Sequence, residues 1–288
     1  MSILVLGASG NTGSEVVRQL KATETPFKVL LRDTRKAADL GISDKESIPG
    51  DFTDIASLQH AFREQDRLYV AMPPHPDNLL WMENVIAAAQ QQHVKHIVKL
   101  SGFGAHPEAG SVIIRTHAQT DALLKASGVD YTLLQPNSFF QNLYSSVPTL
   151  QDHGTFYLPM RNTAQSVVDI RDVAAVAVAA LTQDGHDHKT YRLSGPKALT
   201  FAEQAAIISH AWGKPVDYVA VSKDAAEAAL KEAGLNDWLA ASLAEILDWF
   251  AQGGYDTVTD DIQQVLGSSP RTFEAFAQEF VSAITSTP

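Results

Sequence analysis

The sequence contains no cysteine among its 288 residues. This absence excludes disulfides, thiolate nucleophiles, iron–sulfur clusters and zinc sites built on cysteine. Positive charge is also scarce, because 22 Lys and Arg residues stand against 33 Asp and Glu, which gives a formal net charge of −11. A phosphate backbone repels such a chain, so we expect no nucleic-acid partner.

Long hydrophobic runs are absent as well. The longest apolar run covers residues 173–181, whereas a membrane span needs about 20 apolar residues. This alanine-rich run therefore predicts a core helix, and we expect no contact with a membrane. The first residues also lack the basic region and the apolar length of a signal peptide. The predicted location is the cytoplasm.

The pattern that is present changes along the chain. Up to about residue 135, short apolar runs alternate with segments of helical period, which predicts βαβ units in a doubly wound, parallel α/β sheet. Later helical periods predict a smaller, mainly helical C-terminal lobe. We expect a Rossmann domain in residues 1–150, to which segments around 165–195 can return, and a substrate-binding lobe in residues 151–288.

The expected elements can be placed by their residue ranges. Strands are predicted at 2–6, 27–31, 68–71, 96–100 and 131–134, with a weaker candidate at 46–49. Helices are predicted at 12–21, 55–62, 79–92, 111–126, 201–212, 225–233 and 238–251. Short strands of the second lobe are expected near 157, 191–193 and 216–221.

A glycine-rich motif follows the first predicted strand. Gly7, Gly10 and Gly13 form G-x-x-G-x-x-G between a hydrophobic strand and an amphipathic helix. Glycines at such a turn allow a tight bend, close approach of a pyrophosphate and close packing of helix on strand. The helix N-terminus offers N–H groups to phosphates. Three polar side chains of the loop can add donors, namely Ser9, Asn11 and Thr12.

The end of the second predicted strand bears on the choice of nucleotide. Arg32, Arg35 and Lys36 place three cations in five residues, and these favour the 2′-phosphate of NADPH. Asp33 lies where an acid would bind the ribose 2′-hydroxyl of NADH. NADPH is the predicted cofactor, and NADH stays open as the alternative.

Two further segments fit a dinucleotide site. Asp51 follows the weak strand candidate and can accept a hydrogen bond from an adenine amino group, while Thr53 or Asp54 caps the next helix. Met72 and Pro73 begin a proline-rich loop after the fourth strand, at the expected lip of the cleft. A plain proline turn explains this loop equally well.

These motifs resemble the NmrA-like branch of the atypical short-chain dehydrogenase/reductase superfamily, over nearly the whole chain. The matching segments are 7–13, 32–37, 50–52, 101–105, 117–121, 131–142 and 271–276. The resemblance points towards the bacterial NADPH-dependent quinone reductase and triphenylmethane reductase members. It implies that Asp51 and Phe52 bind adenine, that Arg32 takes the 2′-phosphate, and that Asn137 and its neighbours lie beside the nicotinamide.

The chain departs from the wider superfamily at its catalytic pair. None of the seven tyrosines is followed by lysine four residues later, so the Tyr-x-x-x-Lys proton relay is missing. The helix that would carry the pair holds His117 and Asp121, and His117 is either a proton donor or a structural histidine bonded to Asp121. Ser101 either orients a substrate oxygen or simply ends a strand.

Without that relay, hydride transfer to a flat, electron-poor acceptor such as a quinone is the predicted reaction. The proposed walls of the acceptor site are Phe103, Phe139, Phe140 and Tyr144, with Tyr157 and Trp249 as further candidates. The expected partner is this small molecule, and a homodimer is a possible assembly.

A non-catalytic redox sensor that binds NADP(H), in the manner of NmrA-like regulators, also fits the missing relay. An epimerase or dehydratase acting on a nucleotide sugar is disfavoured because it needs the Tyr–Lys pair. The pair His186 and His188 lacks a third ligand at useful spacing, so no metal site is predicted.

Overall fold

The computed structural model describes residues 1–286 and divides into two compact units. Unit 1 comprises residues 1–107, 116–135 and 170–192, and unit 2 comprises residues 108–115, 136–169 and 193–288. The segment 170–192 therefore belongs to the unit that contains the amino-terminus. The predicted domain boundary at residue 150 stays a prediction.

The central sheet has seven strands in the order β3-β2-β1-β4-β5-β6-β9. Their bounds are β1 Ile3–Leu6, β2 Phe27–Leu31, β3 Ser47–Pro49, β4 Arg67–Val70, β5 His96–Leu100, β6 Asp130–Pro136 and β9 Lys189–Leu193. Strands β1 to β6 pair in parallel, and β1 lies between β2 and β4. The strand order reverses at this point, which confirms the predicted doubly wound fold.

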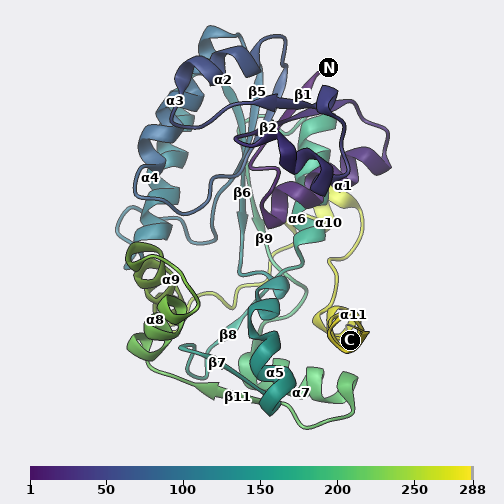
Figure 1. Ribbon diagram of the computed structural model, residues 1–288, viewed down its shortest axis with the longest axis vertical. Coiled ribbons are helices and arrows are strands. Elements are labelled where there is room, and N and C mark those ends of the chain that lie inside the picture. The colour runs from purple at the N-terminus through teal and green to yellow at the C-terminus, as the bar shows by residue number, and fades with distance from the viewer. Residues whose placement is uncertain (287–288) are drawn as a thin grey trace. The chain divides into compact units, whose positions relative to one another are not determined.

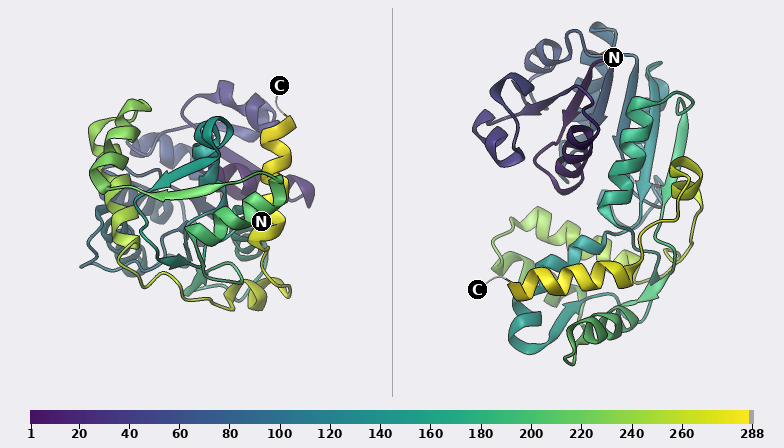
Figure 2. Two further views of the ribbon diagram at one scale, coloured as in Figure 1. Left: turned by 90° about the horizontal axis from the view of Figure 1, so that it is seen from below. Right: turned by 90° about the vertical axis from the view of Figure 1, so that its right-hand side faces the viewer.

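Helices cover both faces of this sheet (Figure 1). They are α1 Asn11–Ala22, α2 Ile55–Phe62, α3 Asn78–Gln91, α4 Val112–Ala126 and α6 Ile170–Thr182, with the short 3-10 helices η1 Thr34–Leu40 and η2 Asp44–Glu46. Helices α1 and α6 pack side by side on one face, and α2 packs against α3 on the other (Figures 1 and 2). Helix α6 contains the alanine-rich run and is buried along most of its length, as predicted.

The core of unit 1 explains why the strands form where they do. In β1 and β4 the side chains Leu4, Leu6, Leu68 and Val70 are fully buried, because helices cover the sheet on both faces. Met82 of α3 completes this part of the core. These strands read as continuous apolar runs, and their polar segments begin at the carboxyl ends.

Unit 2 is mainly helical. Its elements are η3 Phe140–Ser146, α5 Val147–His153, β7 Thr155–Leu158, β8 Ala164–Gln165, β10 Leu199–Thr200, α7 Phe201–Trp212, β11 Asp217–Ala220, α8 Lys223–Glu232, α9 Asp237–Phe250, α10 Asp261–Leu266 and α11 Phe273–Ser286. Helix α7 packs against α11, α8 packs against α9, and two small sheets pair β7 with β11 and β8 with β10. Among residues 1–286, no helix has the length and apolar character that crossing a membrane requires.

Candidate functional site

The glycine loop connects β1 to α1 at the point where the strand order reverses. Gly7 has a φ of +80°, and a Cβ there would lie 2.1 Å from the carbonyl oxygen of Ala71. A Cβ on Gly13 would lie 2.1 Å from the carbonyl oxygen of Gly7. The backbone therefore requires glycine at both positions. Gly10 differs, because its Cβ would meet only the Gly7 carbonyl at 3.4 Å.

The exposed side of this loop ends in the N-terminus of α1. Gly10 is the N-cap residue and provides no side chain to bond the first N–H groups of the helix. Ser9 and Asn11 are exposed, whereas Thr12 is buried. The loop thus leaves helix N–H groups and two polar side chains open to an anion, which fits a pyrophosphate.

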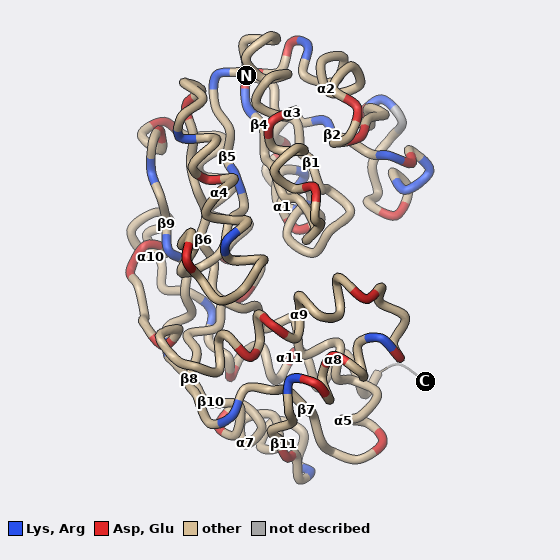
Figure 3. The backbone as a smooth tube through the Cα atoms, turned by 90° about the vertical axis from the view of Figure 1, so that its left-hand side faces the viewer, with Lys and Arg blue, Asp and Glu red and all other residues tan. Residues whose placement is uncertain are grey.

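The segment after β2 carries charges of both signs, as Figure 3 shows. Asp33 caps η1 by accepting the backbone N–H of Arg35, and it also receives two hydrogen bonds of 2.8 Å from the Arg35 guanidinium. This guanidinium holds the pKa of Asp33 below its usual value. The Arg32 side chain is 79% exposed and lies 3.9 Å from Asp51, and Lys36 is exposed.

Asp51 and Phe52 follow β3. The carboxylate of Asp51 accepts the backbone N–H and the hydroxyl of Thr53, each at 2.9 Å. The ring of Phe52 stacks on Trp81 of α3, and Trp81 in turn stacks on His75 with ring centroids 4.3 Å apart. A three-ring stack therefore stands beside the carboxyl ends of β3 and β4.

The loop after β4 supplies the other predicted cofactor contacts. Met72 is half-buried and packs against the core, and Pro73 is exposed. The carbonyl of Pro73 accepts a hydrogen bond of 3.0 Å from Asn78. This loop, the glycine loop and the segments after β2 and β3 all lie at the carboxyl ends of parallel strands, so the fold brings them to one edge of the sheet.

The carboxyl end of β5 carries a buried polar cluster. Lys99 donates to Oδ1 of Asp121 at 2.8 Å, and the side chains are 1% and 5% exposed. The hydroxyl of Ser101 donates to Oδ2 of Asp121 at 2.7 Å, and the amide of Gln135 donates to the same oxygen at 3.3 Å. Burial lowers the pKa of Lys99, which Asp121 opposes.

His117 precedes Asp121 by one turn of α4. Within residues 1–286, neither ring nitrogen of His117 has a hydrogen-bond partner, so its interaction with Asp121 is electrostatic only. Burial and the Lys99 ammonium lower the pKa of His117 to about 3. The imidazole is therefore neutral at neutral pH and cannot act there as an imidazolium acid.

Of the remaining predicted residues, Phe103 is buried in unit 1 and the others belong to unit 2. The amide of Asn137 donates to Ser166 at 2.9 Å and to the carbonyl of Tyr255 at 2.8 Å. Its side-chain oxygen accepts the N–H of Ser138 at 2.8 Å. The side chain of Asn137 is thus engaged within its own unit.

The predicted aromatic residues of unit 2 have different surroundings. Phe140 is 2% exposed and packs against Phe273 and Phe276. Tyr144 is 44% exposed, and Phe139 is half-buried. Phe140 therefore contributes to the core, whereas the other two rings present surface.

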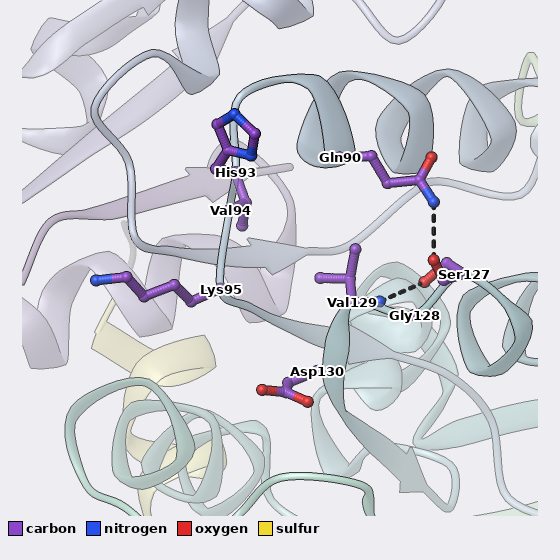
Figure 4. Close-up of a pocket in the computed structure, with 8 residues that line it drawn as sticks. All are labelled: Gln90, His93, Val94, Lys95, Ser127, Gly128, Val129 and Asp130. Atoms are coloured by element: carbon purple, nitrogen blue, oxygen red, sulfur yellow. Dashed lines mark hydrogen bonds between the residues drawn. The ribbon is translucent and has the colours of Figure 1, made fainter.

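A pocket of unit 1 lies at the opposite edge of the sheet, at the amino ends of the strands (Figure 4). It has a volume of about 390 Å³ and is lined by Gln90, His93, Val94, Lys95, Ser127, Gly128, Val129 and Asp130. Gln90 donates to the carbonyl of Ser127 across its rim. These residues lie at the amino ends of β5 and β6, away from the glycine loop. No group of three metal-ligating side chains occurs in the described part of the chain.

Sequence reasoning missed two features of this edge. Lys99 stands in the apolar run of β5, and a lysine between Val98 and Leu100 is a signal that a buried partner is needed. Its partner Asp121 lies 22 residues further on, so the pairing itself could not be predicted. Nothing in the sequence indicated that His75 stacks on Trp81.

The comparisons with known proteins agree with this geometry. The family model described as NAD(P)H-binding matches residues 7–184. An NAD(P)H azoreductase from Xenophilus azovorans is 37% identical over 98% of both chains. The solved structure of an NADPH-dependent quinone oxidoreductase from Escherichia coli with NADPH is 28% identical, with a TM-score of 0.86 over 99% of this chain and 100% of that one.

A triphenylmethane reductase from Citrobacter sp., solved with NADP(H), is also 28% identical, with a TM-score of 0.83 over 98% of this chain and 100% of that one. All these relatives are matched over nearly their full length, so the likeness includes both units. The chain belongs to the NAD(P)H-binding family, as an NmrA-like atypical short-chain dehydrogenase/reductase among NAD(P)H-dependent oxidoreductases.

Proposed function

We propose that the chain is a reductase that transfers a hydride from NADPH to a quinone or a similar flat, electron-poor acceptor. One observation carries this proposal. The glycine loop, the cationic segment and the Asp51–Phe52 segment follow strands whose carboxyl ends lie at one edge of the sheet, and the sequence contains no Tyr-x-x-x-Lys motif. Relatives named for the reduction of azo compounds and quinones support it.

The residues of unit 1 fit the nucleotide as follows. The N–H groups at the start of α1, with the exposed Ser9 and Asn11, would hold the pyrophosphate. Phe52 and Asp51 would hold the adenine, and Met72 with Pro73 would border the nicotinamide half. Bound NADPH supplies the hydride.

Cofactor preference follows from the charges after β2. Arg32 is exposed and only loosely paired, so it would take the 2′-phosphate, with Lys36 nearby. Arg35 is held by Asp33 through two hydrogen bonds. We propose that NADPH is preferred and that NADH also binds, because Asp33 can accept a ribose hydroxyl when it is not occupied by Arg35.

Hydride transfer to such an acceptor requires that the acceptor be aligned with the nicotinamide, and it does not require an acid catalyst. Reduction of a quinone or of a cationic dye yields a product that solvent can protonate, so the missing relay is no obstacle. Phe103 of unit 1 stays our candidate for the wall of the acceptor site, Phe139 and Tyr144 stay candidates within unit 2, and Phe140 belongs to the core of unit 2. The side chain of Asn137 is engaged and its N–H donates to the carbonyl of Leu193 at 2.9 Å, so a role beside the nicotinamide would fall to its own carbonyl oxygen.

Absorbance of NADPH, followed by stopped flow with a panel of quinones and azo dyes, tests the proposal. We expect acceptor-dependent oxidation, and calorimetry should show tighter binding of NADP(H) than of NAD(H). Tight NADP(H) binding without oxidation by any acceptor would reject the reductase and support the alternative, a non-catalytic redox sensor.

A further inference from the structure

Two residues of α9 hold the segment in which α4 begins, and both lie with that segment in unit 2. The carboxylate of Glu245 accepts the backbone N–H of Val112, the first residue of α4, at 2.6 Å. The half-buried Trp249, a further candidate for the acceptor wall, lies so close to Gly110 that a Cβ there would be 2.3 Å from Cε3 of the indole. A carboxylate at a helix N-terminus satisfies a free N–H group and complements the helix dipole, so a distant helix supplies the cap of α4.

The residue between these two contacts is Ser111, which stands at the N-cap position of α4. Its carbonyl accepts the N–H of Arg115 at 3.0 Å, the first hydrogen bond of the helix. A serine at this position ordinarily accepts an N–H of the first turn with its side chain. The Oγ of Ser111 is instead buried and has no hydrogen-bond partner within residues 1–286, which is unfavourable for a hydroxyl. The contacts of α9 with Gly110 and Val112 thus fix both neighbours of a serine that caps nothing.

Helix α9 packs against α8, and glycines flank the second helix of this hairpin. Gly234 lies between the two helices, and Gly253 and Gly254 follow α9. All three have a positive φ, and a Cβ on any of them would meet nothing within 4 Å. Such positions can change φ and ψ at little cost. No residue of α8 is buried, so the hairpin can turn at both ends of α9 and α8 adds nothing buried that would hold it.

Tyr255, directly after these glycines, connects the hairpin with the candidate site. Its hydroxyl accepts the indole N–H of Trp249 at 2.8 Å, and its ring packs on Phe250 with centroids 4.3 Å apart. Its carbonyl accepts the side-chain amide of Asn137 at 2.8 Å. The carboxyl end of α9 is thus anchored beside a predicted site residue, and the cap by Glu245 lies one turn further from this anchor.

We propose that the α8–α9 hairpin, residues 223–250, is a lid that docks on the start of α4 through Glu245, and that Ser111 takes over as the cap of α4 when the lid undocks. In the docked state the carboxylate of Glu245 satisfies the first N–H group. In the undocked state Gly110 and Val112 are released, and the Ser111 oxygen turns to the N–H groups of the first turn. Because one cap replaces the other, α4 remains capped in both states and undocking costs less. The lid goes beyond the proposed reductase, and its role as a gate for the acceptor rests on that function.

Hydrogen exchange read by mass spectrometry tests the lid without turnover. Ser111→Ala removes the cap of the undocked state and no hydrogen bond of the docked one. Exchange of the α9 amides should therefore slow about fivefold, the effect of one lost N-cap on the undocked state. Glu245→Ala removes the cap of the docked state, so exchange in α8, in α9 and at residues 110–115 should become faster. In both variants exchange in β1 and β4 should remain as in the native chain.

Ser222→Ala is the matched control for Ser111→Ala. Ser222 is the N-cap residue of α8, and its side chain accepts the N–H of Ala225 at 3.1 Å, so it already caps its helix. The same substitution there should speed exchange in α8 rather than slow it. Glu232→Ala removes an exposed carboxylate at the end of α8 and should leave exchange in α4 unchanged. Unchanged or faster exchange of α9 in Ser111→Ala, or no effect of Glu245→Ala, would overturn the lid.

Turnover tests the gate separately. We expect Ser111→Ala to lower kcat/KM for a quinone about fivefold, in step with the rarer undocked state, and to leave the Kd for NADPH unchanged. Slowed exchange with an unchanged kcat/KM would keep the lid and reject its role as a gate. Absence of turnover with every acceptor would reject the reductase, while hydrogen exchange would still decide whether the lid exists.

Discussion

A histidine lies near each end of β5, His96 at the amino end and His117 near the carboxyl end. The two differ in the hydrogen bonds that their ring nitrogens make. At the amino end, Nε2 of His96 bonds with the hydroxyl of Thr132 at 2.9 Å, and that hydroxyl donates to the carbonyl of His186 at 2.7 Å. Because the Thr132 hydroxyl donates its one hydrogen to that carbonyl, it must accept from His96, and Nε2 of His96 is the donor. Towards the carboxyl end, His117 has no such partner among the described residues.

Burial alone therefore does not show whether a histidine is available to a ligand. Burial lowers the pKa of His96 to about 4 and contributes most to the lowered pKa of His117. The partners of the ring nitrogens make the distinction, because a histidine whose donor is used internally has less to offer a ligand. We expect the amino edge of the sheet to govern stability and the carboxyl edge to govern binding.

The largest difference between the two edges is expected from changing one glycine to alanine at each, Gly7 at the carboxyl edge and Gly128 at the amino edge. Gly7 and Gly128 have nearly the same φ, +80° and +78°, but a Cβ on Gly7 would strike the Ala71 carbonyl whereas one on Gly128 meets nothing within 4 Å. Gly7→Ala should cost about 4 kcal/mol of unfolding free energy, from strain and overpacking, and raise the Kd for NADPH at least about tenfold.

Gly128→Ala controls for backbone strain alone. It should cost about 1 kcal/mol and leave NADPH affinity unchanged. Urea unfolding and fluorescence titration with NADPH measure the two effects. If Gly128→Ala weakens NADPH binding as much as Gly7→Ala, the division between the edges is wrong.

Lowering the pH should destabilise the fold, because burial keeps His96 and His117 neutral in the folded chain. The pKa of His96 in the folded chain, about 4, lies below the ordinary 6.5, so the unfolded chain binds more protons between these values. The stabilising contribution is complete above pH 6.5 and is lost as the pH falls to 4, roughly 3 kcal/mol in all. Urea unfolding from pH 7 to 4 should show this slope, and His96→Gln should reduce it by about 1.4 kcal/mol per pH unit. An unchanged slope in His96→Gln would contradict the buried neutral state.

A smaller effect is expected from Thr132→Val. The change leaves the donor of His96 and the carbonyl of His186 without their partner, which should cost about 1–3 kcal/mol of unfolding free energy. The Kd for NADPH and the turnover should remain as in the native chain. A loss of turnover without a loss of stability would place a functional residue at the amino edge.

The smallest effect concerns the nucleotide preference. Asp33→Ala releases the exposed Arg35 from its ion pair, so Arg35 can join Arg32 at a 2′-phosphate. We expect the ratio of the Kd for NADH to that for NADPH to rise about twofold to fivefold, in keeping with the weakness of exposed pairs. Calorimetry with both nucleotides measures it. A fall in the ratio would show that Asp33 helps to bind the phosphorylated cofactor.

Local patterns made much of unit 1 predictable. Strands β2 and β5 and helix α2 have the predicted bounds, and β3 forms at residues 47–49 within its weak candidate. These segments combine clear apolar periods with local signals such as the Asp54 cap, which bonds the N–H groups of Ala56 and Ser57. Helices α5, α10 and α11 were not predicted; of these, α11 packs against α7, which lies far earlier in the chain.

The candidate site was predictable only where its residues lie close together in one segment of the sequence. The glycine loop is continuous in sequence, and the family resemblance supplied roles for Asp51 and Arg32. The ion pair of Lys99 with Asp121 joins a strand to a helix, and the engagement of Asn137 by Tyr255 spans 118 residues. Such contacts depend on the fold, which no local period specifies.

The division of the chain into units has a consequence for any attempt to take it apart. The chain passes from one unit to the other five times, at residues 107/108, 115/116, 135/136, 169/170 and 192/193. Neither unit can be released by one protease cut or exchanged as a cassette through one splice. Recombination between relatives would have to exchange several segments at once, so unit 2 would be expected to diversify by substitution in place rather than by replacement.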